Sequence, residues 1–212
     1  MKKKKDKLNK FSVPLGLLDY INPILYTITI VTIINNNFLN SPYNIILLVG
    51  GIISIIFGFI IPTGKVIVGL GIIEFKMPVS LVFCVNSGIL LSGLMLLKYV
   101  FNINLFILLI ISLIIILLLF KIYTKSKKIN TIAVLTGAFG YLMLYISLIT
   151  ISIRNNYILP IFLYGLAILL FVMLCGIGIK ANLKNPKVHW VIEISNVICQ
   201  FLVAIATIIL FK

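Results

Sequence analysis

The residues best suited to chemistry lie in the last apolar stretch of the chain, residues 188–211. Four polar side chains there share one face of a helix, because they follow one another at intervals of four, three and four residues: His189, Glu193, Asn196 and Gln200. A carboxylate surrounded by Val, Ile, Leu and Phe is costly within a membrane and normally faces other protein or a watery cavity. The stretch therefore predicts a polar site inside the protein.

The first apolar stretch, residues 11–34, carries a related pattern. Asp19 is followed three residues later by Asn22, as Glu193 is followed by Asn196. Pro23 lacks a backbone donor, so it is expected to kink this helix and free a carbonyl near Asp19. Two acidic, amide-bearing faces at similar depth predict a site for a cation, an amine or a proton. Its candidate residues are Asp19, Asn22, Glu193, Asn196 and Gln200.

Two further titratable side chains are candidates for proton handling. His189 lies one turn before Glu193, and Glu74 lies beside Lys76 in an apolar segment with charged flanks. Structural alternatives remain open for all these residues. The acids can reach lipid headgroups or pair with loop lysines, the amides can simply hydrogen-bond between helices, and His189 can be an interfacial residue.

Composition assigns the chain to the membrane. Of its 212 residues, 62% are hydrophobic and 10% are charged, whereas about a quarter of the residues are charged in a typical soluble domain. The net charge of +14 comes from the tail and the loops, so we expect contact with anionic lipid headgroups and no nucleic acid partner. The three cysteines lack metal-ligand spacing, and we expect neither a metal site nor a cofactor.

The hydrophobic pattern predicts an all-α bundle of seven transmembrane helices. A basic tail, residues 1–10, precedes one membrane domain, residues 11–212, whose first helix is expected to be retained rather than cleaved as a signal peptide. The apolar part of residues 63–78 is too short to span a bilayer. It is expected to be a non-spanning apolar loop: re-entrant, interfacial or an extension of a neighbouring helix. The seven predicted spans are residues 11–34, 43–62, 79–97, 104–120, 131–153, 157–179 and 188–211.

The lysine and arginine residues predict the orientation. We expect every lysine at a helix end or in a loop, and an inside N-terminus then places 15 basic residues inside and 3 outside, with the C-terminus outside. An additional crossing at residues 63–78 would reverse the later loops. The abundance of Ile, Asn and Lys indicates an AT-rich bacterial genome and hence a plasma membrane location.

Two stripes of small residues at four-residue spacing predict close helix packing. One lies on the second predicted span and the other on the third: Gly50, Ser54 and Gly58, then Ser80, Cys84, Gly88 and Ser92.

Three functional hypotheses follow. The first is a small transporter or solute-binding protein that takes a small cationic or amine solute at the intramembrane acids. The second is a non-catalytic subunit or scaffold, which docks a membrane-protein partner or a second copy through the small-residue stripes. The third is a lipid-modifying enzyme that depends on carboxylates. An enzyme is not favoured, because the chain has one histidine and no G-x-S-x-G sequence.

Overall fold

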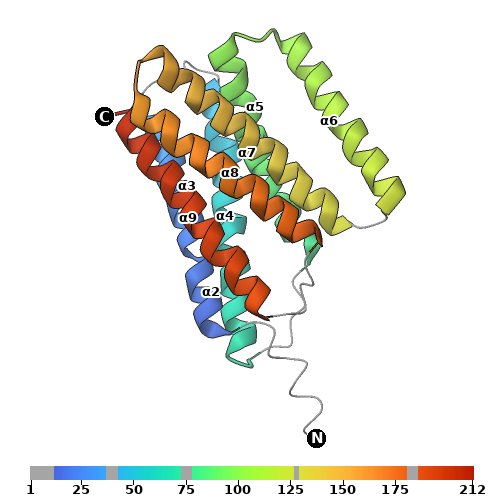
Figure 1. Cartoon of the computed structure of the whole chain (residues 1–212). Coiled ribbons are helices and arrows are strands. Elements are labelled where there is room, and N and C mark those ends of the chain that lie inside the picture. The colour runs from blue at the N-terminus through green and yellow to red at the C-terminus, as the bar shows by residue number, and fades with distance from the viewer. Residues whose placement is uncertain (1–11, 37–42, 73–77, 127–128, 181–185) are drawn as a thin grey trace, which may run out of the picture.

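The computed structural model describes residues 12–36, 43–72, 78–126, 129–180 and 186–212 (Figure 1), and the all-α prediction is confirmed. An apolar first span is interrupted at Tyr20, where α2 ends and α3 begins one residue later. The helices in these ranges are α2 (Val13–Asp19), α3 (Ile21–Asn35), α4 (Tyr43–Gly69), α5 (Val79–Phe101), α6 (Leu105–Ser126), α7 (Ile129–Arg154), α8 (Ile158–Lys180) and α9 (Pro186–Leu210).

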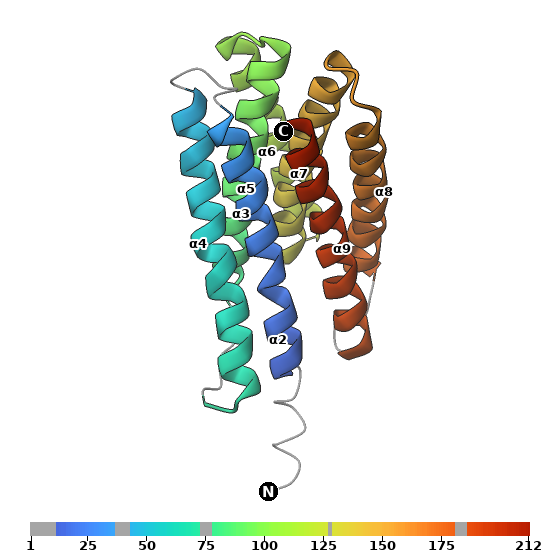
Figure 2. The same ribbon diagram turned by 90° about the vertical axis from the view of Figure 1, so that its left-hand side faces the viewer.

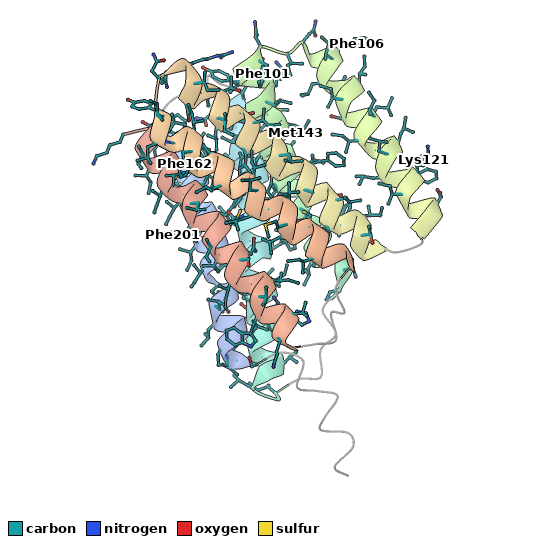
Figure 3. All side chains as sticks on the ribbon, in the orientation of Figure 1. Phe101, Phe106, Lys121, Met143, Phe162 and Phe201 are labelled. Atoms are coloured by element: carbon teal, nitrogen blue, oxygen red, sulfur yellow. The ribbon has the colours of Figure 1, made fainter. Side chains whose placement is uncertain are left out.

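The chain is a multi-pass membrane protein. Within the described residues, six helical segments are long and apolar enough to cross a membrane, and Phe106–Ile122 of α6 adds a shorter apolar helix. Large apolar side chains point outward from the bundle in Figure 3, among them Phe106, Phe162 and Phe201, whose exposed fractions are 68%, 62% and 52%. A surface of this kind is solvated by lipid tails rather than by water.

Six of the spans form a closed ring. The segment α2–α3 packs on α4, followed in order by α5, α7, α8 and α9, and α9 closes the ring by packing on α2 and α3. Figure 2 shows α3 between α4 and α9, and Figure 1 shows α6 at the margin, where it contacts α7 and α5. The first and last spans are therefore neighbours, which brings their two acidic faces together.

The second span is longer than its sequence suggested. We expected it to end at Pro62, but α4 continues through this proline to Gly69. Proline removes one backbone donor, and a membrane helix that is packed against other helices tolerates that loss. Of the alternatives for residues 63–78, an extension of the neighbouring helix is correct for residues 63–69. Glu74 lies outside the described residues.

The buried charged residues lie in one half of the bundle along its length, whereas buried hydroxyl groups occur in both halves. The hydrophobic core is densest where α3, α5, α7 and α9 end, and it includes the fully buried side chains of Ile33, Leu96, Leu148 and Val203. The opposite half, where these helices begin, contains the polar residues that the sequence singled out. The buried charges therefore indicate a site in the half where these helices begin.

The small-residue stripes of α4 and α5 pack on each other. A Cβ atom at Gly88 would lie 2.5 Å from the backbone oxygen of Gly50, and one at Gly50 would lie 2.7 Å from Ser92 Oγ. Ser54 Oγ crosses the contact and donates to the backbone oxygen of Val85 at 3.0 Å. Glycine is required at this crossing because the two backbones approach too closely for a side chain.

Because of this contact, we expect alanine to be tolerated less well at Gly88 than at a glycine outside it. Gly88→Ala should lower the melting temperature in detergent, because the new methyl group meets backbone and overpacking typically costs about 1–3 kcal/mol. Gly165→Ala in α8 should leave it unchanged or raise it, because nothing lies within 4 Å of that Cβ position and alanine favours helix. Equal melting temperatures for the two variants would contradict the α4–α5 packing.

Candidate functional site

Three charged side chains from three spans meet inside the bundle. Lys65 Nζ of α4 lies 2.7 Å from Asp19 Oδ2 of α2 and 2.6 Å from Glu193 Oε1 of α9. The side chains are 10% exposed for the lysine and 11% exposed for each acid. We refer to Asp19, Lys65 and Glu193 as the charge cluster. Charge-assisted contacts of this length are strong when they are shielded from water, and they tie α2, α4 and α9 together.

The sequence around Asp19 brings α2 close to the lysine. Ser12 caps the start of α2 by accepting a hydrogen bond from the Leu15 amide. A Cβ atom at Gly16 would lie 2.8 Å from a Val66 methyl carbon and 3.3 Å from Lys65 Cβ. The glycine thus permits the close approach that lets the short Asp19 side chain reach the ammonium group.

Proline and tyrosine interrupt the first span directly beside the cluster. Pro23 has no N–H to bond the carbonyl of Asp19, four residues earlier, and the helix breaks at Tyr20. In membrane proteins, interrupted helices are tolerated where they line a cavity, and they often expose backbone carbonyls to a ligand. The helix is interrupted three residues before Pro23, but the backbone of Tyr20 keeps helical angles (φ −63°, ψ −24°). The kink expected from the sequence therefore stays a prediction.

Asn22 extends the cluster toward the centre of the ring. Its Nδ2 donates to Asp19 Oδ1 at 3.1 Å, so Asp19 accepts from Asn22 with one oxygen and from Lys65 with the other. The amide orientation follows from the chemistry, because a carboxylate accepts hydrogen bonds and repels a carbonyl oxygen. The Oδ1 atom of Asn22 is consequently turned away from Asp19.

A cavity of about 210 Å³ adjoins the charge cluster. Residues of α2, α3, α4, α5, α7 and α9 line it, so it lies at the centre of the ring. Its polar lining comes from Asp19, Asn22, Tyr26, Ser54, Asn86, Tyr141 and Asn196, and its apolar lining from Pro23, Gly58, Ile61, Val82, Val85 and Ile89.

Several buried polar atoms beside the cavity lack a hydrogen-bond partner among the described residues. These are Asn22 Oδ1 and the Tyr26 hydroxyl, both from lining residues, together with Ser92 Oγ and Gln200 Nε2. Tyr26 is 4% exposed, and its hydroxyl lies near Ser54 and Ser92 without hydrogen-bonding geometry. Buried polar groups are normally satisfied, so this pattern is typical of a place that a ligand or water completes.

The structure brings together four of the residues that the sequence placed in the site. Asp19, Asn22 and Asn196 line the cavity, and Glu193 is joined to Asp19 through Lys65. Gln200 is buried deeper along α9, beside Tyr141 rather than on the cavity wall.

The two candidates for proton handling have different outcomes. His189 is half-buried near the start of α9 and is not among the residues that line the cavity. Glu74 lies outside the residues that the structure describes.

Lys65 is the member of the charge cluster that the sequence did not predict. The expectation that every lysine lies at a helix end or in a loop is wrong, because Lys65 is 9% exposed and lies inside α4. The spacing of residues in α4 could have identified it. Because the helix continues through Pro62, Lys65 shares one helical face with Ser54, Gly58 and Ile61. The intervals of four, three and four residues are the same as those between the polar residues of α9.

Comparison of the chain with protein-family models, with curated proteins and with solved structures finds no match. In the described part of the chain, no three His, Cys, Asp or Glu side chains gather as metal ligands do. The Lys65 ammonium group occupies the space between the two carboxylates. What the site can do is inferred from its own residues.

The charge cluster predicts a non-additive effect on stability. Lys65→Met removes the shared partner of two buried carboxylates, and breaking a buried ion pair in this way typically costs about 3–5 kcal/mol. Adding Asp19→Asn and Glu193→Gln to Lys65→Met should recover much of that loss, because no buried charge is then left unpaired. Thermal unfolding in detergent checks both variants.

The matched control for this experiment is Lys121→Met, which replaces an exposed lysine at the end of α6. It should change the melting temperature little. A triple variant that is as unstable as Lys65→Met would show that the three charges do not act as a unit.

Proposed function

We propose that this integral membrane protein binds a small cation in the cavity beside the charge cluster and transports it. The observation that supports the proposal is the position of Asp19, which belongs to the cluster and also lines the cavity. A ligand in the cavity can therefore interact directly with a carboxylate that is otherwise shielded from water.

Charge balance favours a cation. With all three groups ionised, the two carboxylates and one ammonium group of the cluster leave one net negative charge in a largely apolar bundle. An uncompensated charge in such surroundings is unfavourable by several kcal/mol. A bound monovalent cation or a proton removes the imbalance, whereas an anion would double it.

The positions of the hydrophobic core and the cavity support transport of the bound cation rather than binding alone. The apolar core closes the ring on the side where α3, α5, α7 and α9 end, and the cavity lies in the other half. A binding site closed on one side is one of the two states that alternating access requires. The break between α2 and α3 lies at the cavity wall and supplies a place where the backbone can change direction.

The alternative functions have less support. The scaffold hypothesis used the small-residue stripes as docking surfaces, yet Gly50 and Gly88 are already covered by each other within the chain. A carboxylate-dependent lipid enzyme needs an acid that is available for proton transfer, and both acids of the cluster contact Lys65.

The proposed orientation follows the lysine distribution. The N-terminus and the cavity half of the bundle would face the cytoplasm of a bacterial plasma membrane, and the C-terminus would face the exterior. Lys65 is no longer counted among the basic residues of the inside loops, because it is buried in α4. Most of the remaining basic residues still lie in the segments that are predicted to face the inside.

The test is cation binding by purified protein. Thermal unfolding is recorded with chloride salts of sodium, potassium, ammonium and methylammonium, all at the same ionic strength. At least one of these cations should stabilise the wild type, by about 2.7 kcal/mol at one hundred times its Kd. The same cation should enter proteoliposomes.

Two matched variants locate the effect. Asp19→Asn removes a charge and replaces a carboxylate of the cavity lining by an amide, whereas Glu193→Gln removes only a charge outside the lining. Both keep a neutral ion pair with Lys65, so both should fold, and both should lose stabilisation by the cation, Asp19→Asn the more completely. The proposal fails if no cation stabilises the wild type, or if Asp19→Asn responds as the wild type does.

A further inference from the structure

We propose that the ligand of this cavity is a small monovalent organic ammonium ion with N–H donors and a short apolar body. This inference rests on the proposed function and specifies its substrate class. An inorganic cation would satisfy the charge of the cluster equally well. The remaining walls of the cavity distinguish between the two.

One wall of the cavity is aromatic. Tyr26 and Tyr141 both line it, and their rings lie 6.4 Å apart at 84° to each other. The faces of aromatic rings carry partial negative charge and attract organic cations, and each such contact tightens binding by about 2- to 30-fold. Phe171 packs on Tyr141 at 5.2 Å from outside the cavity and supports this corner. A hydrated metal ion gains little from such a wall.

The unpartnered oxygen of Asn22 selects for a hydrogen-bond donor. Because Nδ2 is held by Asp19, the free atom of the amide is Oδ1, which is buried and accepts no hydrogen bond from the described residues. A primary ammonium group can donate to this oxygen and to the Asp19 carboxylate at once. A quaternary ammonium ion has no N–H and would leave the oxygen unsatisfied.

The size and the apolar lining limit the rest of the ligand. The cavity, at about 210 Å³, has the volume of about seven water molecules at about 30 Å³ each. Its apolar lining, which includes Ile61, Val85 and Ile89, suits a few methylene groups. Burial of each methylene group tightens binding by about fourfold. A short alkyl amine satisfies both the polar and the apolar walls.

The net charge of the cluster limits the ligand to one positive charge. A single ammonium group neutralises the one surplus negative charge. A diamine of the same length would place a second charge among the apolar side chains of the cavity, which is unfavourable. We therefore expect butylammonium to bind more tightly than 1,4-diammoniobutane, although the two ions have nearly the same length.

The test compares five probes on the full-length protein in detergent: butylammonium, 1,4-diammoniobutane, tetramethylammonium, sodium and potassium. Dissociation constants come from calorimetry, and thermal shifts serve as a second readout. Butylammonium should bind at least about tenfold more tightly than each of the others, which corresponds to about 1.4 kcal/mol.

Aromatic variants separate the role of the ring faces from that of the charge. Tyr26→Leu and Tyr141→Leu should each weaken butylammonium binding by about 2- to 30-fold, the range that follows from a single cation–π contact. Tyr26→Phe and Tyr141→Phe keep the rings and should bind within about threefold of the wild type. Phe171→Leu is the matched control, because this ring touches Tyr141 but does not line the cavity.

Each outcome decides between the two proposals. If sodium or potassium binds more tightly than butylammonium and needs Asp19, the inference is overturned while the proposed function stands. If tetramethylammonium or the diamine binds as tightly as butylammonium, the stated ligand class is wrong. Leucine variants that bind like the wild type overturn the aromatic recognition. If no probe binds, the proposed function and the inference fall together.

Discussion

The contact on which the rest of the structure depends is the burial of one ammonium group between two carboxylates. Lys65 lies within 2.7 Å of both Asp19 and Glu193, and each of the three comes from a different span. None of these charges would be stable alone at this depth, since isolated ionised groups inside a membrane protein are strongly disfavoured. Their mutual attraction fixes the relation of α2, α4 and α9 where apolar packing alone would leave the helices free to slide.

The cluster also explains why the cavity lies where it does. Pro23 cannot donate to the carbonyl of Asp19, which interrupts the first span at Tyr20, and Gly16 lets α2 approach α4 closely. These departures from regular helix packing keep polar groups on the inner wall, while the opposite half of the ring closes around apolar side chains. The same residues that secure the charges thus prevent the bundle from collapsing into a continuous core.

The sequence predicted the helices and two of the three charges, because apolar length and residue spacing are local properties of the chain. It did not predict that the first and last spans touch, since loop lengths do not determine the order of helices around a ring. Lys65 was assigned to a loop because proline usually ends a helix, and here surrounding helices keep α4 intact beyond Pro62. Gln200 shares its helical face with Glu193 yet misses the cavity, because a side chain nearly two turns deeper meets Tyr141 instead.

The most direct test is an experimental structure of the protein with butylammonium bound. We expect the ammonium nitrogen within hydrogen-bonding distance of Asp19 and Asn22 Oδ1, the alkyl chain against the apolar wall, and Lys65 still between the two carboxylates. A structure in which the cavity is filled by a neighbouring side chain would contradict the binding site. So would one in which Lys65 points away from Asp19 and Glu193, because the two acids would then carry two unpaired negative charges instead of the single surplus charge that we propose attracts a monovalent cation.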